Sequence, residues 1–142
     1  MAIKNNVFVD SNFLIGLYNA SDTLHGKTSA INARLASSGA RLYVSNYILL
    51  EVLTVLSQRI GRAEAIAVGN NIIDGGHIEV IHINEDMHAL SWNIFQLVTN
   101  KNVSFVDCSI LAVMQDSGIR HLLTFDKTDF GPLRKQFGFS FF

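Results

Sequence analysis

The chain has 142 residues, of which 49% are hydrophobic and 16% are charged, and its net charge at pH 7 is −1. This composition predicts one folded domain and excludes a disordered chain. The near-neutral charge also excludes a general electrostatic attraction to nucleic acid, so a polyanionic partner would require a local basic patch, a metal ion or a companion protein.

The strands and helices predicted from the sequence alternate along the chain. Strands are predicted at 7–9, 41–44, 78–83, 121–125 and 137–142. Helices are predicted at 13–18, 22–37, 47–59, 62–73, 85–98 and 106–117. The residues expected to cap these helices are Ser11 or Asn12, Ser45 or Asn46, Asn84, and Ser104 with Asp107.

The order of these elements is β-α-α-β-α-α-β-α-α-β-β, and no two-residue hairpin joins two strands. The connections are therefore crossovers, which predicts an α/β fold with a mainly parallel sheet of about five strands and helices on both faces. The apolar strand 78–83 is expected to be largely buried.

A single cysteine, Cys108, excludes an internal disulfide and a cysteine-based zinc site. A cytoplasmic location is the simplest expectation. The N-terminal sequence MAIKNN lacks the apolar region of a secretory leader. The longest apolar stretch, YILLEVLTVL, contains Glu51 and is shorter than the ~18 residues of a membrane span, so no membrane association is expected.

Two carboxylates follow predicted strands directly. Asp10 comes after the first strand and Asp126 after the fourth. Ligands of parallel α/β sheets bind beyond the carboxyl ends of the strands. We therefore expect these two side chains to share one crevice.

Three acids lie within apolar segments: Asp10 in VFVDSNFLIGL, Glu51 in YILLEVLTVL and Asp107 in FVDCSILAVM. Burying an unpaired carboxylate is costly, and none of these segments contains Lys or Arg. A hard divalent cation such as Mg²⁺ or Mn²⁺ would neutralise such carboxylates. The alternative is structural: Asp10 and Asp107 cap helices, and Glu51 extends from the start of its helix to the surface.

Three blocks of the chain resemble the PIN-domain ribonucleases, and among them the VapC-type toxins of toxin–antitoxin pairs. The blocks are VFVDSNFLIGLYN, SNYILLEVLTVL and SFVDCSILAVMQDSGIRHLLTFDKTDF. The resemblance runs from Val7 to Phe130. It implies a PIN-like three-layer α/β/α sandwich, formed as a single nuclease domain over residues 1–142.

The resemblance also implies an activity. An RNA phosphodiester would be hydrolysed by a water activated by Mg²⁺ or Mn²⁺, leaving a 3′-hydroxyl and a 5′-phosphate. The expected partners are the RNA substrate, a second copy of the chain and a small antitoxin that covers the cleft. Two apolar segments offer surface for such partners or else belong to the core, namely the C-terminal FGFSFF and the helix 47–59.

Roles for individual residues follow from the same resemblance. The expected catalytic and metal-binding acids are Asp10, Glu51, Asp107 and Asp126, with Asp129 as a neighbour or alternative to Asp126. Polar residues expected around these acids are Asn12, Ser45, Ser104 and Thr124. Lys127, Arg134 and Lys135 either contact the RNA backbone or form a solvated turn.

Other functions fit the sequence less well. DSN after the first strand lacks the acidic pair of a receiver domain and the Asp-x-Asp of a haloacid-dehalogenase phosphatase, and no glycine-rich phosphate loop follows any strand. None of the five histidines pair at metal-ligand spacing. Cys108 has either a lowered thiol pKa or a packing role. Two alternatives to a toxin stay open: a catalytically silent PIN-like module that binds RNA or protein, and a PIN nuclease of RNA processing.

Overall fold

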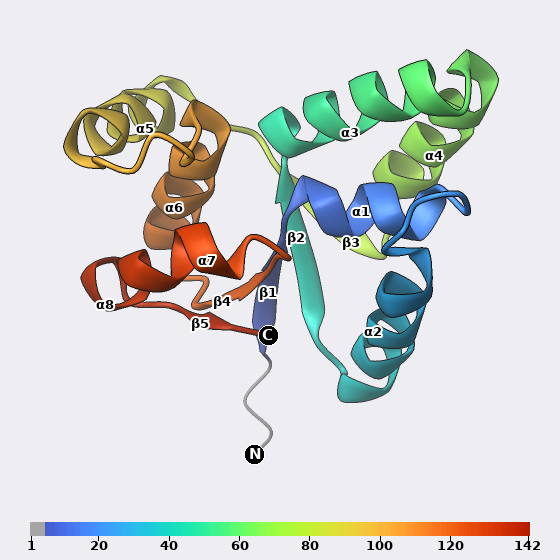
Figure 1. The fold of residues 1–142 in the computed structure, drawn as a ribbon, viewed down its shortest axis with the longest axis horizontal. Helices are drawn as coiled ribbons and strands as arrows, with labels where there is room; N and C mark the ends of the chain where they lie inside the picture. The colour runs from blue at the N-terminus through green and yellow to red at the C-terminus, as the bar shows by residue number, and fades with distance from the viewer. Residues whose placement is uncertain (1–4) are drawn as a thin grey trace.

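The computed structural model describes residues 5–142, and a five-stranded sheet lies at its centre (Figure 1). The strands are β1 (Asn6–Val9), β2 (Arg41–Ser45), β3 (Ile78–Ile81), β4 (His121–Leu123) and β5 (Ser140–Phe141). Their order is β3-β2-β1-β4-β5, and every neighbouring pair is parallel. All strands therefore end at the same edge of the sheet, which confirms the predicted α/β class.

Helices connect each strand to the next. They are α1 (Ser11–Tyr18), α2 (His25–Ser38), α3 (Asn46–Arg59), α4 (Arg62–Asp74), α5 (Glu85–Leu97), α6 (Phe105–Ser117), α7 (Lys127–Phe130) and α8 (Arg134–Phe137). Figure 1 shows α5 and α6 on one side of β1 and β2, and α1 to α4 on the other. No helix within residues 5–142 is long and apolar enough to cross a membrane.

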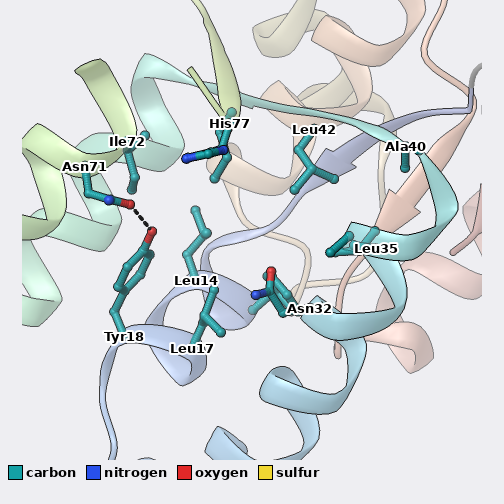
Figure 2. A pocket seen from close by; sticks show the side chains of 14 residues that line it. Leu14, Leu17, Tyr18, Asn32, Leu35, Ala40, Leu42, Asn71, Ile72 and His77 are labelled. Atoms are coloured by element: carbon teal, nitrogen blue, oxygen red, sulfur yellow. Dashed lines mark hydrogen bonds between the residues drawn. The ribbon is translucent and has the colours of Figure 1, made fainter. Parts of the chain in front are cut away.

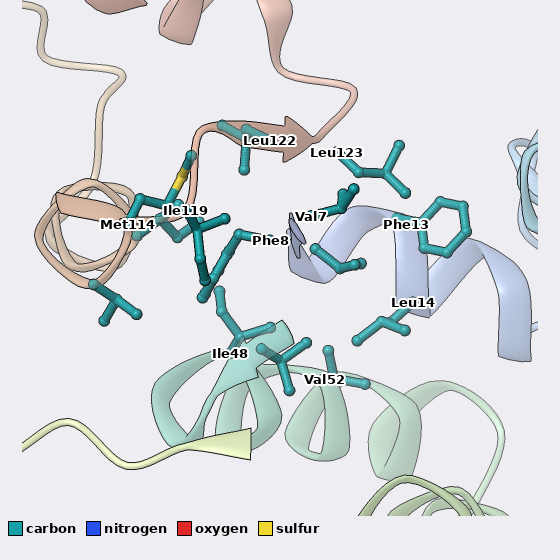
Figure 3. Packing of buried hydrophobic residues seen from close by; sticks show 14 of the residues in the cluster. Val7, Phe8, Phe13, Leu14, Ile48, Val52, Met114, Ile119, Leu122 and Leu123 are labelled. Carbon is teal, nitrogen blue, oxygen red and sulfur yellow. The ribbon is translucent and has the colours of Figure 1, made fainter. Parts of the chain in front are cut away.

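The hydrophobic core forms around the central strand β1. Val7, Phe8 and Val9 are completely buried. Helices cover both faces of this strand, so side chains that point to either face are shielded from solvent. Figure 3 shows Phe8 among apolar side chains of several elements, including Ile48 of α3 and Leu122 of β4. The sequence VFV therefore fixes the position at which β1 ends and Asp10 begins.

Two sequence predictions near the sheet edges are wrong. The strand predicted at 78–83 forms only at Ile78–Ile81 and is half-buried, because β3 is an edge strand with a neighbour on one side alone. The strand predicted at 137–142 is reduced to Ser140–Phe141. The segment before it forms α7, a 3-10 turn (Gly131–Leu133) and α8, so that β4 and β5 are also joined by a helical crossover.

Helices α1 and α2 pack closely at Gly16. A Cβ atom added to this glycine would lie 2.8 Å from Cγ2 of Thr28, which is fully buried. The carbonyl oxygen of Gly16 also lies 2.8 Å from Nδ1 of His25, at the start of α2. A residue without a side chain therefore sets the distance between the two helices.

We expect Gly16→Ala to destabilise the protein by about 1–3 kcal/mol, because Thr28 is β-branched and has little room to move. The free energy of unfolding in urea measures this cost. Gly26→Ala is the matched control in α2, since no atom lies within 4 Å of its added Cβ. Equal stabilities of the two variants would contradict the close packing of α1 on α2.

Candidate active site

Asp10 lies where β1 passes into α1 and is 3% exposed. Its backbone N–H donates to the carbonyl of Leu123 in β4 at 2.9 Å. Its Oδ1 accepts from the backbone N–H of Ser11 at 2.7 Å, so Asp10 itself is the N-cap of α1. The interpretation of Asp10 as a helix cap is therefore confirmed, and the prediction of Ser11 or Asn12 as the cap is wrong, because the extended backbone of Asp10 starts the helix earlier.

A chain of hydrogen bonds joins Asp10 to the end of β4. The hydroxyl of Thr124 donates to Oδ2 of Asp10 at 2.7 Å and accepts from the backbone N–H of Asp126 at 3.0 Å. Asn12 reaches the same loop, since its Oδ1 accepts from the N–H of Phe125 at 3.3 Å and its amide nitrogen lies 3.5 Å from the Thr124 hydroxyl. The structure thus brings together four residues singled out in the sequence.

Asp107 occupies the first turn of α6. Its Oδ2 accepts from the backbone N–H of Ser104 at 2.9 Å, while the Ser104 hydroxyl accepts from the Asp107 N–H at 3.1 Å. This capping box confirms the predicted helix start. Within residues 5–142, Oδ1 of Asp107 accepts no hydrogen bond and remains free for a ligand.

Glu51 lies on α3 and is half-buried. Together with Val55, and with Val106 of α6, it lines an apolar groove between the two helices. Val106 is the immediate neighbour of Asp107. Glu51 therefore faces the start of α6, and its charge contributes to the raised pKa of Asp107.

The acids of this edge disfavour one another's charged forms. Burial raises the pKa of Asp10 from 3.8 to about 7, hydrogen bonds from Thr124 and Ser11 oppose the rise, and repulsion by Asp107 and Asp126 adds to it. Burial also raises the pKa of Asp107, and repulsion by Asp126 and Glu51 contributes. The pKa of Asp126 is raised by burial and by Asp129. The site is an electrostatically coupled group of carboxylates.

These oxygen donors suit a hard divalent cation. No three His, Cys, Asp or Glu side chains in the described part of the chain converge closely enough to hold a metal unaided. Mg²⁺ is commonly bound by only one or two carboxylates, and water and substrate phosphate complete its shell. Because cation binding would relieve the mutual repulsion of Asp10, Asp107 and Asp126, this donor set fits Mg²⁺ or Mn²⁺.

Other residues singled out in the sequence lie outside this hydrogen-bonded group. Ser45 is buried and caps α3 by accepting from the N–H of Ile48 at 3.2 Å. Asp129 accepts from the side chain of Asn100 at 3.3 Å. Burial and the neighbouring Asp107 raise the pKa of Cys108 to about 11, so the option of a lowered thiol pKa is wrong.

The predicted RNA-contacting cations lie over or near the last strand. Lys127 and Arg134 are placed over the ring of Phe141, at 5.7 and 5.1 Å from its centroid. Lys135 is exposed. One cation near the acids was not found in the sequence: Lys27 of α2 lies 5.1 Å from the ring centroid of Phe125, the residue before Asp126. No local pattern around Lys27 pointed to this contact.

A large cavity lies away from the acids (Figure 2). It measures about 540 Å³ and is enclosed by α1, α2, α4 and the start of β3. Its lining is mainly apolar, with a hydrogen bond of 2.9 Å from the Tyr18 hydroxyl to the Asn71 side chain at one end. No carboxylate lines it, so this cavity is separate from the acidic site.

Comparison with known proteins gives consistent matches. The model of the PIN domain family matches residues 7–131. The 23S rRNA-specific endonuclease VapC20 of Mycobacterium tuberculosis is 32% identical over 120 residues, which cover 84% of this chain and 88% of that protein. Its crystal structure, described as that of a sarcin–ricin-loop-cleaving toxin, superposes with a TM-score of 0.75 over 94% of this chain and 96% of that one.

More distant structures share the fold. A toxin–antitoxin complex from Klebsiella pneumoniae superposes with a TM-score of 0.60 at 20% identity, over 87% of this chain and 89% of that chain. VapBC2 from Rickettsia felis, bound to a DNA fragment of its promoter, superposes with a TM-score of 0.64 at 12% identity, over 89% of this chain and 92% of that chain.

We expect the metal-free protein to lose stability as the pH rises from 3.8 towards about 7. In this interval the folded chain keeps a proton on Asp10 that the unfolded chain releases. Protonated Asp10 therefore contributes its full stabilisation below the unfolded-state pKa of 3.8, and this contribution is lost as the pH rises through the folded-state pKa of about 7. Urea unfolding in EDTA at a series of pH values measures how steeply the free energy of unfolding falls with pH. Asp10→Asn has no such proton and should show a shallower decline; an unchanged slope would contradict the assignment.

Proposed function

Because this chain belongs to the PIN-domain family and is an endoribonuclease of the VapC type, we propose that it hydrolyses RNA with a divalent cation, Mg²⁺ or Mn²⁺. One or two of the acids Asp10, Glu51, Asp107 and Asp126 would bind the cation directly, and the others would reach it through water. The observation that carries this proposal is the coupling of the acids at the carboxyl edge of the sheet. Burial raises the pKa of Asp10, Asp107 and Asp126, and repulsion by neighbouring carboxylates adds to each rise, which a bound cation would relieve.

The residues around the acids prepare them for this chemistry. Thr124 and Ser11 each donate to one oxygen of Asp10 and fix the plane of its carboxylate. Ser104 donates to Oδ2 of Asp107, and among residues 5–142 Oδ1 accepts no hydrogen bond, so it can bind a ligand. When bound, a divalent cation lowers the pKa of a coordinated water and offsets negative charge on the attacked phosphate. Asn12 and Thr124 act as positioning residues for Asp10 and for the loop that carries Asp126.

Asp126, rather than Asp129, is the better fourth acid. Its N–H donates to the Thr124 hydroxyl that also binds Asp10, and its charge raises the pKa of both Asp10 and Asp107. Asp129 bonds to Asn100 and acts on Asp126 alone. We assign Asp129 a supporting electrostatic role.

The relatives suggest a substrate and partners. VapC20 is named for 23S rRNA, so 23S rRNA is the first substrate to test, in the cytoplasm where we place this chain. Two of the structural neighbours are toxin–antitoxin assemblies, which supports a toxin whose antitoxin covers the acidic edge.

Exposed apolar side chains supply surface for that antitoxin and for a second copy of the chain. They are Leu50 of α3, Ile66 and Ile73 of α4, and Trp92, Phe95 and Leu97 of α5. The C-terminal FGFSFF contributes less, because Phe139 is buried and the other three phenylalanines are half-buried against the core.

We expect Asp107→Asn to reduce RNA cleavage at least about a hundredfold. The substitution removes a charged metal ligand, and losing a residue that only supports such a ligand already costs about 10–100-fold. Asparagine still accepts from the Ser104 N–H, so the helix cap and the fold should persist. Cleavage of purified rRNA with Mg²⁺, Mn²⁺ or EDTA is the measurement, and Asp116→Asn at the exposed end of α6 is the matched control.

The same assay separates the activity from its alternatives. Cutting that requires a divalent ion and is lost only in Asp107→Asn supports the proposal. No cutting by the unaltered chain with any divalent ion would favour the silent binding module. Cutting that continues undiminished in Asp107→Asn would refute the site.

We expect Asp126→Asn to lower cleavage at least about tenfold and Asp129→Asn to change it little, since the charge of Asp126 acts on Asp10 and Asp107 whereas that of Asp129 acts on Asp126 alone. Initial rates at saturating Mn²⁺ compare the two variants directly. A larger loss in Asp129→Asn would reverse the assignment of the fourth acid.

A further inference from the structure

Two cations of α2 lie over aromatic rings at the ends of β4 and β5. Lys27 Nζ is 5.1 Å from the ring centroid of Phe125, and the guanidinium carbon of Arg34 is 5.8 Å from that of Phe142. Lys27 and Arg34 are seven residues apart, about two helical turns, so both side chains extend from the same face of α2. This face lies against the residues that follow β4 and β5.

The two rings connect this face to the acids. Phe125 stands between Thr124 and Asp126. Phe142 donates its backbone N–H to the carbonyl of Leu122 in β4 at 3.0 Å, which places it beside the end of that strand. Lys27 therefore contacts the residue next to an expected catalytic acid in the sequence, and Arg34, two turns along α2, contacts the ring that follows β5.

Both cations keep their charge available. They are exposed, and the structure pairs neither with a carboxylate; among residues 5–142 it forms one ion pair, Arg59 with Asp22 at 3.6 Å. An aromatic face attracts a cation without neutralising it. Lys27 and Arg34 are thus held in place and still free to bind an anion.

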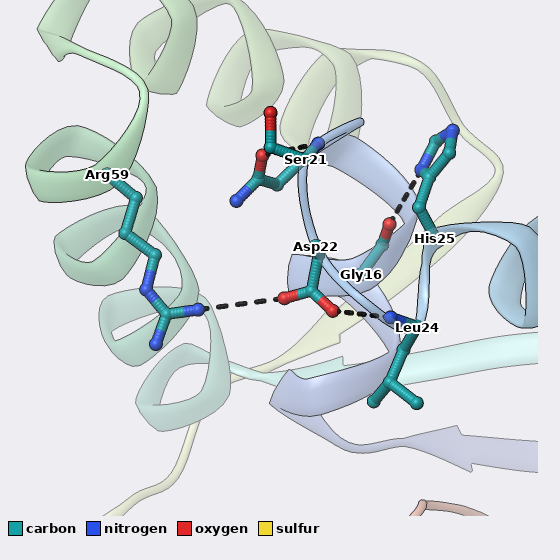
Figure 4. Close-up of polar contacts among 7 residues, drawn as sticks. Gly16, Ser21, Asp22, Leu24, His25 and Arg59 are labelled. Atoms are coloured by element: carbon teal, nitrogen blue, oxygen red, sulfur yellow. Dashed lines mark hydrogen bonds and ion pairs between the residues drawn. The ribbon is translucent and has the colours of Figure 1, made fainter.

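The start of α2 is anchored, so these cations have a defined position. Figure 4 shows Asp22 between Arg59 of α3 and the backbone N–H of Leu24, which it accepts at 2.9 Å. Nδ1 of His25 lies 2.8 Å from the carbonyl oxygen of Gly16 in α1. These contacts attach the segment before α2 to α3, and the first residue of α2 to α1.

We propose that Lys27 and Arg34 form a phosphate-binding ridge that holds the RNA strand beside the acids. The inference rests on the ribonuclease function proposed above. A chain with net charge −1 has no general attraction for RNA, and its acidic edge repels phosphate. Two unneutralised cations next to that edge supply the local attraction, and Phe125 and Phe142 fix where they act.

The test measures RNA binding rather than cleavage. In the full chain carrying Asp107→Asn, the double variant Lys27→Gln with Arg34→Gln should weaken binding of a short labelled single-stranded RNA about tenfold. The slope of log affinity against log salt should also fall by about 1.4, since each phosphate contact with a single strand contributes about 0.7. Fluorescence anisotropy at several salt concentrations gives both values.

Two control variants test whether the loss of RNA binding comes from the charges of Lys27 and Arg34 themselves, and not from the lower net charge of the chain or from unfolding. Arg41→Gln with Arg120→Gln removes the same charge from exposed residues at the amino ends of β2 and β4, and should leave binding unchanged. Lys27→Arg with Arg34→Lys keeps both charges and should retain affinity. Urea unfolding of each variant verifies that the fold is intact.

The outcomes are distinguishable. The ridge is refuted if Lys27→Gln with Arg34→Gln binds RNA as tightly as its parent. It is also refuted if Arg41→Gln with Arg120→Gln loses as much RNA affinity as Lys27→Gln with Arg34→Gln. If the unaltered chain fails to cut RNA while binding still depends on Lys27 and Arg34, the proposed catalytic function fails and the ridge stands.

Discussion

The hydrogen bond from Thr124 to the buried Asp10 is the contact on which the site depends. It joins the ends of β1 and β4, two strands that lie side by side in space but more than a hundred residues apart in the chain. Through the same hydroxyl it also orients the loop that carries Asp126. The parallel order of the sheet makes this contact possible, because neighbouring parallel strands end at one edge.

Structural and chemical roles coincide in these acids. Asp10 caps α1 and Asp107 completes the capping box of α6, so each carboxylate is oriented by the start of its own helix. A helix N-terminus stabilises negative charge, yet burial raises the pKa of both side chains. The caps therefore compensate only part of the cost of gathering these carboxylates, and the proposed cation would offset the rest. The structural and functional interpretations of each acid are two aspects of one arrangement.

The sequence predicted most of this arrangement because its signals are local. Apolar VFV followed by Asp10, and Ser104 three residues before Asp107, identify a strand end and a capping box without tertiary information. Features that depend on the position of an element in the sheet were not predictable. The half-buried state of β3 follows from its place at the edge, and the packing of FGFSFF follows from α7 and α8. The seating of Lys27 over Phe125 joins residues almost a hundred positions apart, with no periodic pattern to indicate it.

A nuclease that binds RNA with a nearly neutral chain has to keep its cations close to its acids without letting the two cancel. Direct ion pairs would neutralise both groups, and the acids would lose part of their attraction for a metal ion. Aromatic rings avoid this loss, because a ring holds an ammonium or guanidinium group through its quadrupole and leaves the full charge for phosphate. In this chain Phe125 and Phe142 hold Lys27 and Arg34, while Phe141 holds Lys127 and Arg134. The phenylalanines in β5 and after β4 and β5 thus hold these cations without pairing them with carboxylates, which leaves their charge for a phosphate backbone if the proposed ridge binds RNA.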